Sequence, residues 1–374
     1  LDDNRNDLSL PLSNIQALRE AARILNTRAY FHLGEERHAA AWRHAKATLD
    51  LARATAEGPY WVDQLVAAAI GGIGLDVVHA IVADDQLPPP TARKVFADLS
   101  VATPLTQMLR STDQGERFFA INTILGMGSD TSVLSGWTDD SISEPLRHTR
   151  IDWNIALEDL NNRQDLVLAA ARAKSWAARQ AAFAAIDDAD QTRGDAISNS
   201  TMLGGSLLGT RRRSRLMSDL INTGFMSSPS MVFAAEYRVA AQLQLTNIAA
   251  ALAVHRCEQG GYPETLEALV PNLLPTKPTD TMHGKPIGYR RTDDGYLLYS
   301  CGPNGVDDGG SNEQRVQLAG KDVSGDNWSD ADESDPVDPD TNEPLWQQIP
   351  AGADDISIRV PIPVEPWPWE RPGR

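Results

Sequence analysis

The sequence predicts an α+β protein in which a mostly helical N-terminal domain precedes a long helix packed on a small antiparallel sheet. Three observations lead to this fold class. Apolar residues recur at helical spacing through much of residues 14–187. Residues 231–258 form one Ala-rich stretch with a wide apolar face. Two tyrosine-rich, strand-like segments then follow, separated by the turn sequence TDDG.

Helical periodicity begins near the N-terminus. Residues 14–57 are expected to form two helices, because Gly34 interrupts a run of apolar residues at helical spacing. The PPP sequence at 88–90 is expected to separate two further helices. These further helices are predicted at 60–83, at about 91–110 and, as one long helix or two shorter ones, at 150–187.

The composition and the apolar periodicity of the chain change after residue 187. Residues 188–230 have weak periodicity and many Gly, Ser and Thr residues, so we expect a linker with short helices there. The chain is therefore divided into a helical domain, this linker, a helix-plus-sheet module and an acidic, Pro-rich C-terminal extension. The corresponding boundaries are 1–187, 188–230, 231–326 and 327–374.

The stretch GGYPETLEALVPNLLP, residues 260–275, is predicted to be the corner between the long helix and the sheet. Its two glycines suit the left-handed end of a helix, and Pro263 suits the first turn of a short helix at 265–270. A lone helix cannot bury the wide apolar face of 231–258, whereas a sheet laid across that face can. We therefore expect Tyr262 and Pro263 to be largely buried.

The chain has two cysteines, Cys257 and Cys301. Two are too few for a disulfide scaffold or a cysteine-rich zinc site. Cys257 lies on an apolar stripe of the long helix, and Cys301 shares a strand face with Leu297 and Tyr299. The two cysteines are therefore expected to approach each other, and whether they form a disulfide stays open.

Charge excludes one class of partner. The formal net charge is −17 and the pI is about 4.8, so duplex nucleic acid would meet a surface of like charge. Residues 322–343 contain nine acids and no lysine or arginine.

A basic cluster either pairs with the protein's own acidic segments, which we favour, or meets an anionic membrane surface. Its members are Arg211, Arg212, Arg213 and Arg215.

No membrane-spanning segment is predicted within the sequence. The apolar stretch from Leu65 to Leu75 has roughly half the ~20 residues that a spanning helix needs. No secretory signal is visible. The chain opens with LDDNRNDL and not with Met, so an anchor upstream of Leu1 stays open.

The order of motifs after residue 231 resembles the soluble head of the major pseudopilin of type II secretion systems. It is still more similar to uncharacterised, membrane-anchored bacterial proteins that carry this head behind a large helical region. The resemblance covers about 231–326, roughly a quarter of the chain. The matching positions are Gly261, Tyr262, Pro263, Leu266, Leu269, Pro275, Asp280, Gly284, Pro286, Tyr289, Tyr299, Ser300, Gly302, Asn304 and Gly305.

This resemblance implies a calcium site, because the Gly/Asp loop after the last Tyr-Ser strand binds calcium in that family. Calcium needs several oxygen ligands on a loop that can wrap a large ion. The sequence SCGPNGVDDGG supplies Asn304, Asp307 and Asp308, and Asp322 and Asp326 downstream could complete the ligand shell. The alternative is a solvated turn built by Asn-Gly and Asp-Gly chemistry.

The resemblance also implies a place and a role. It predicts a protein on the periplasmic or extracytoplasmic side of the cell envelope, held by a membrane anchor in the full-length protein. The expected partners are other envelope or secretion proteins, or further copies of the chain. About 230 residues precede the long helix here, whereas a pseudopilin begins with that helix, which argues against ordinary fibre assembly.

No catalytic residue is predicted. The sequence contains no G-x-S-x-G and no H-E-x-x-H, and acidic pairs carry no information in so acidic a chain. We therefore expect a non-enzymatic structural or interaction protein. Two alternatives stay open: an exported hydrolase with its site between the helical domain and the head, and a module that binds peptides on its helical hairpins.

Overall fold

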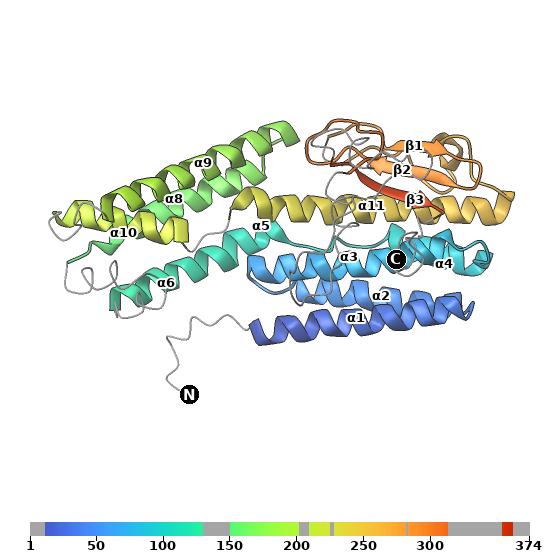
Figure 1. Ribbon diagram of the computed structural model, residues 1–374, viewed down its shortest axis with the longest axis horizontal. Coiled ribbons are helices and arrows are strands. Elements are labelled where there is room, and N and C mark those ends of the chain that lie inside the picture. The colour runs from blue at the N-terminus through green and yellow to red at the C-terminus, as the bar shows by residue number, and fades with distance from the viewer. Residues whose placement is uncertain are drawn as a thin grey trace, which may run out of the picture. The chain divides into compact units, whose positions relative to one another are not determined.

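The computed structural model of the chain describes residues 12–129, 150–201, 209–224, 228–281, 283–312 and 354–361. It confirms the predicted fold class: most of these residues are helical, and one small antiparallel sheet lies near the C-terminal end (Figure 1). Contacts divide the chain into two compact units. The bundle unit comprises Leu1–Ala21, Asp50–Ile70 and Pro104–Glu236, and the head unit comprises Ala22–Leu49, Gly71–Thr103 and Tyr237–Arg374.

Four of the five boundaries between the two units fall inside helices, and the fifth, between Thr103 and Pro104, lies between two helices. The units therefore do not follow the domain boundaries that we predicted from sequence. The helices of the first hundred residues are present as predicted, and the first of them ends at Gly34. Their bounds are α1 (Leu12–Gly34), α2 (His38–Thr55), α3 (Trp61–Ala83) and α4 (Pro89–Ser100).

Helix α3 is more apolar over its full length than the stretch 65–75 suggested. Among the described helices it is the one that is long and apolar enough to cross a membrane, with a mean hydropathy of 2.1 over its most apolar window. Within the structure, 61% of that window is buried, and buried core helices of soluble proteins pass the same test. The length and composition of α3 are therefore weak evidence for a membrane span.

The helix predicted at about 91–110 is interrupted. Helix α4 ends at Ser100, and α5 (Met108–Arg110) leads through a π-helical turn (Ser111–Glu116) into α6 (Arg117–Ser129). Gly115 lies in the π-helical turn, where a Cβ atom would fall 1.6 Å from the carbonyl oxygen of Pro59. Only glycine fits this close approach of two backbone segments.

The segment 188–230, predicted as a linker with short helices, is helical over most of its described residues. Helix α9 (Trp176–Thr201) and helix α10 (Thr210–Gly224) both extend into it. With α6 and α8 (Trp153–Ala171), they form the core of the bundle unit. One apolar cluster joins α6, α8 and α10 and includes Ile124, Leu160 and Met217.

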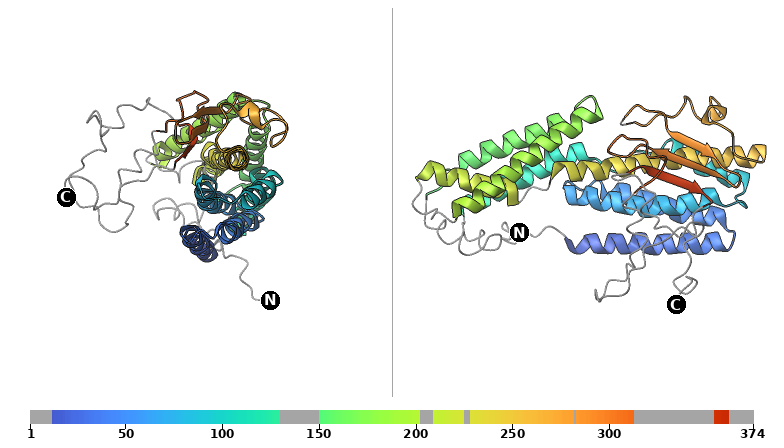
Figure 2. Two further views of the ribbon diagram at one scale, coloured as in Figure 1. Left: turned by 90° about the vertical axis from the view of Figure 1, so that its right-hand side faces the viewer. Right: turned by 45° about the horizontal axis from the view of Figure 1, so that its top comes forward.

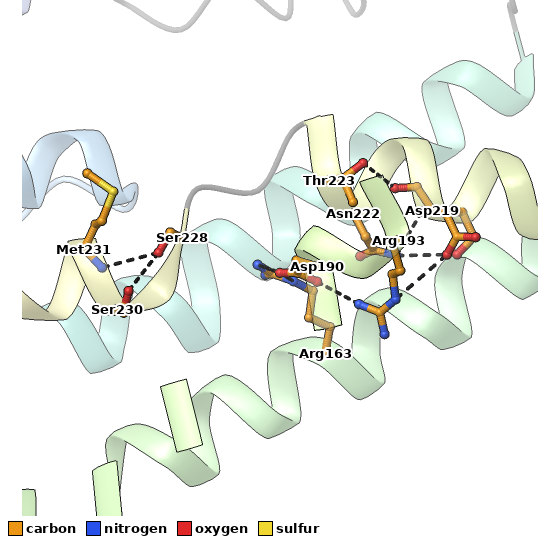
Figure 3. Close-up of polar contacts among 10 residues, drawn as sticks. Arg163, Asp190, Arg193, Asp219, Asn222, Thr223, Ser228, Ser230 and Met231 are labelled. Carbon is orange, nitrogen blue, oxygen red and sulfur yellow. Dashed lines mark hydrogen bonds and ion pairs between the residues drawn. The ribbon is translucent and has the colours of Figure 1, made fainter. Parts of the chain in front are cut away.

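A network of charged side chains also joins the helices of the bundle unit (Figure 3). Arg163 on α8 is only 3% exposed and donates from Nε and Nη2 to Asp190 Oδ2 on α9, at 2.9 and 2.6 Å. Arg193, one turn further along α9, donates from Nη1 to Asp190 Oδ1 at 2.7 Å. Its Nε lies 3.9 Å from Asp219 on α10. The Asp190 carboxylate therefore forms ion pairs with both Arg163 and Arg193.

The head unit contains the predicted long helix, α11 (Pro229–Gln259), which begins in the bundle unit. A sheet with strand order β1-β2-β3 lies along it (Figures 1 and 2). The predicted hairpin is present as β1 (Gly288–Arg291) and β2 (Tyr296–Ser300), with Gly288 opposite Tyr299. The third strand, β3 (Ile356–Val360), pairs antiparallel with β2 and comes from the segment assigned to the C-terminal extension.

The predicted corner is a 3-10 turn, Leu266–Leu269, after the end of α11. Pro263 is buried as predicted, but Tyr262 is only partly buried. The Tyr262 ring packs edge-on against Tyr296 with ring centroids 4.8 Å apart. The Arg256 guanidinium lies over the Tyr262 ring, 5.4 Å from its centroid. The ring therefore joins the end of α11 to the central strand.

Replacing Tyr262 with alanine should lower the free energy of unfolding by about 2 kcal/mol, less than the loss for a fully buried aromatic residue. Tyr262→Phe keeps both ring contacts and should change stability little. The measurement is denaturant unfolding of the whole chain, because a fragment that ends before Ile356 would lack β3. Equal losses in the two variants would contradict the proposed role of the ring.

Candidate metal centre

The Gly/Asp loop after β2 is organised around Asp355, which lies directly before β3. Asp355 Oδ2 accepts hydrogen bonds from the backbone N–H groups of Asp308 (3.0 Å) and Gly310 (2.8 Å), and Oδ1 accepts one from Gly302 (3.3 Å). The Asp355 N–H in turn donates to the carbonyl of Ser311 at 3.0 Å. One buried carboxylate therefore holds both ends of the loop.

Glycine is required at two points of this loop. Gly310 has φ +83°, a left-handed conformation that aims its N–H at Asp355 and that other residues rarely adopt. Gly302 passes so close to Asp354 that a Cβ atom would lie 2.0 Å from the Asp354 carbonyl oxygen. The glycine-rich composition therefore lets the loop fold tightly over the two aspartates.

Three carboxylates converge at this point: Asp308, Asp354 and Asp355. One oxygen from each lies within 4.8 Å of the others. Asp354 Oδ2 accepts the N–H of Asn304 at 3.0 Å, whereas Asp354 Oδ1 is buried and has no hydrogen-bond partner among the described residues. A buried carboxylate oxygen without a partner, in a residue that lies beside two further carboxylates, is a feature that a cation would satisfy.

The electrostatics agree with this geometry. Burial raises the pKa of Asp354, and the neighbouring Asp308 carboxylate raises it further. Burial also raises the pKa of Asp355, against its backbone hydrogen bonds, which lower it, and Asp308 again adds to the increase. Both shifts show that negative charge is disfavoured here, so a bound cation would relieve the cost.

The five residues that the sequence predicts as metal ligands do not all lie at the three converging carboxylates. Asp308 is one of the three converging carboxylates, and Asn304 lies beside it, with Nδ2 3.4 Å from Asp308 Oδ2. Asp307 lies outside the group, and its Oδ1 accepts the N–H of Gly309 at 3.0 Å. Asp322 and Asp326 lie outside the described residues.

Sequence reasoning missed Asp354 and Asp355, because they lie more than forty residues beyond the loop. A signal for them was present. The sequence DDISIRV alternates apolar and polar residues directly after two aspartates, as expected for a strand that starts at a polar loop.

Cationic groups lie near the three carboxylates and bear on any metal site. His283 Nε2 lies 3.0 Å from the carbonyl oxygen of Gly302, and Lys285 donates to the carbonyl of Gly305. Arg238 and His283 both lie close enough to Asp354 to lower its pKa, yet burial outweighs them. A metal at this site would therefore compete with partial compensation by the protein's own cations.

A buried polar cluster fixes the loop relative to α11. The Tyr237 hydroxyl, on α11, lies 3.2 Å from Asp280 Oδ2 and 3.0 Å from the carbonyl oxygen of Cys301. Ser300, at the end of β2, donates to the same Asp280 oxygen. Asp280 Oδ1 accepts the N–H of His283 at 2.9 Å. These contacts hold the end of β2, where the loop begins.

The contact between Tyr237 and Cys301 overturns one expectation. Cys257 lies 20 residues after Tyr237 on the same helix, which corresponds to about 30 Å. That distance far exceeds the reach of a tyrosine side chain plus the ~4.4–6.8 Å between the Cα atoms of a disulfide. The predicted approach of the two cysteines is therefore wrong, and both are free thiols.

The three carboxylates could share one cation. One oxygen of each lies within 4.8 Å of the others, a spacing that a single oxygen-liganded cation can bridge. Three carboxylates leave room for water and carbonyl ligands to complete a shell of six to eight. No family model, no curated protein and no solved structure matches this chain.

Proposed function

We propose that this chain is a non-enzymatic structural or interaction protein of the cell envelope. In this proposal, its C-terminal part is a head of the kind found in the major pseudopilin of type II secretion, and calcium stabilises the loop of that head. The full-length protein is held at the extracytoplasmic side of a membrane. Its partners are other envelope or secretion proteins or further copies of itself.

One observation carries the proposal: a Gly/Asp loop closes over carboxylates, and one buried oxygen of Asp354 has no partner in the part of the chain that the structure describes. The setting supports it, because the loop follows the Tyr-Ser end of a β-strand and that strand packs with α11 through Tyr237 and Asp280. Since the loop and the strand both depend on these contacts, an ion at the loop would stabilise the whole head.

Calcium should raise the stability of the metal-free protein. Because only the folded loop brings the carboxylates together, the increase is about 2.7 kcal/mol when free calcium exceeds Kd a hundredfold. Magnesium should have a smaller effect. The measurement is the thermal unfolding midpoint of the whole chain, first in chelator and then in calcium or magnesium.

Two variants test whether the calcium response comes from the three converging carboxylates or from other acidic residues of the chain. Asp354→Asn should abolish the calcium response and leave the metal-free protein as stable or more stable, because it removes one of three repelling charges. Asp338→Asn, outside the loop, should keep the full response. Identical unfolding midpoints in chelator and in calcium would refute the site.

The response should also depend on pH. The raised pKa values of Asp354 and Asp355 contribute stability below the unfolded-state pKa of ~3.9, and this contribution is lost as pH rises through the folded-state pKa values. Calcium takes the place of the protons. The gain from calcium should therefore be larger at neutral pH than at mildly acidic pH, and the difference should vanish in Asp354→Asn.

A further inference from the structure

Helix α10 of the bundle unit begins with an arginine-rich turn (Figure 1). Arg211, Arg212 and Arg215 are exposed, and Arg211 and Arg215 lie one turn apart on the same side of the helix. Arg150 is also exposed and lines a pocket of about 590 Å³ together with Thr210, the first residue of α10. We call these four arginines the basic patch.

The basic patch is not neutralised by the described parts of the chain. None of its four arginines forms an ion pair with a residue in those parts. Three acids lie close. Asp152 donates its N–H to Ser214 of α10 at 2.8 Å, Asp159 accepts the Ser218 hydroxyl at 2.8 Å, and the pKa of Asp219 is raised mainly by burial, with Arg215 acting to lower it. Asp152 already accepts the N–H of Asn154 at 3.2 Å as a helix cap. Among the residues that the structure describes, positive charge therefore predominates at the start of α10.

The face of α10 that adjoins the basic patch packs inside the bundle unit. Met217 and Ile221 are buried in the apolar cluster with α6 and α8, and Ser218 donates to Asp159 Oδ2 at 2.8 Å. The patch therefore offers guanidinium groups without an exposed apolar anchor on the same helix. Arginine at a protein interface usually acts together with buried aromatic anchors. Guanidinium groups without such an anchor are complementary in charge to an extended plane of negative charge.

We propose that the basic patch binds the surface of an anionic phospholipid membrane through the lipid phosphates. Each arginine near such a surface contributes to binding, and salt screens interactions beyond about 8 Å, so the local positive charge outweighs the net charge of −17. The proposal rests on the envelope location proposed above and is independent of calcium.

The test is binding of the whole chain to vesicles of phosphatidylcholine with and without phosphatidylglycerol. Chelator is present throughout, so that calcium cannot bridge acidic segments to lipid. Binding should require the anionic lipid and fall with added salt. The triple variant Arg211→Gln, Arg212→Gln, Arg215→Gln should lower the partition coefficient about a hundredfold, at about fivefold per arginine.

A scattered triple variant is the matched control, because it changes the net charge equally: Arg28→Gln, Arg43→Gln, Arg290→Gln. It should bind vesicles like the parent. The lysine variant Arg211→Lys, Arg212→Lys, Arg215→Lys should also retain binding, because a membrane surface attracts either cation.

Three results would overturn the proposal. One is equal binding to neutral vesicles, and another is equal loss of binding in the patch and scattered variants. The third is binding of inorganic phosphate or polyglutamate, through the patch, without binding to anionic vesicles, which would assign it to a soluble anion or an acidic protein segment. A calcium response with no vesicle binding would refute this inference alone.

Discussion

Replacing Asp190 with alanine should lower the free energy of unfolding by about 3–5 kcal/mol, the loss expected when one partner of a buried ion pair is removed. Asp190 accepts both hydrogen bonds of the buried Arg163 guanidinium and one from Arg193 (Figure 3). Arg193 is 40% exposed and can turn to water, but Arg163 cannot. The measurement is denaturant unfolding of the whole chain.

Two control variants test whether the loss of stability comes from leaving Arg163 buried without its partner. Asp188 lies two residues earlier on α9 and is exposed, so Asp188→Ala should change stability by less than about 0.5 kcal/mol. The double variant Arg163→Met, Asp190→Leu removes both buried charges and should recover most of the loss, because apolar side chains of similar size can replace a buried pair. A loss below about 1 kcal/mol for Asp190→Ala would show that Arg163 is compensated in another way.

Helices with apolar side chains on their buried faces were predictable from sequence, and α10 was not. Its buried face repeats Ser214, Ser218 and Asn222 at helical spacing, and small polar residues of this kind favour caps and turns in other contexts. Inside the bundle unit they are satisfied by bonds such as that from Asn222 Nδ2 to the Ser218 carbonyl at 3.0 Å. Met217 and Ile221, which are buried on the same helix, are the local helical signal that the sequence reading overlooked, and the polar positions depend on tertiary contacts.

Only the loop residues of the candidate metal centre could be predicted from the sequence. The loop residues Asn304 and Asp308 lie in a local motif that carries its own signal. Asp354 and Asp355 join them only because β3 returns from a distant part of the chain to pair with β2. Which distant strand completes a sheet edge depends on pairing in three dimensions, so a single sequence cannot select it among the many acids of this chain.

Replacing Asp280 with alanine should lower the free energy of unfolding by about 4 kcal/mol. Asp280, Tyr237 and Ser300 are 2%, 2% and 1% exposed, so water cannot replace the lost carboxylate. The N–H of His283 would lose its acceptor, and Ser300 would keep a longer bond, of 3.4 Å, to the Cys301 carbonyl. Bonds to a charged group are worth about 1.5–3 kcal/mol each. The Tyr237 hydroxyl would keep the Cys301 carbonyl as acceptor and should add little to the loss.

Unfolding should be followed in chelator, so that a change in calcium affinity does not enter the comparison. Asp293→Ala is the matched control, because Asp293 is an exposed aspartate in the turn between β1 and β2 and should have little effect. Tyr237→Phe should cost about 1 kcal/mol, the value of one hydrogen bond between largely neutral partners. A loss of less than about 1 kcal/mol for Asp280→Ala would mean that the cluster does not hold the end of β2 to α11. The loop carboxylates would then need another support.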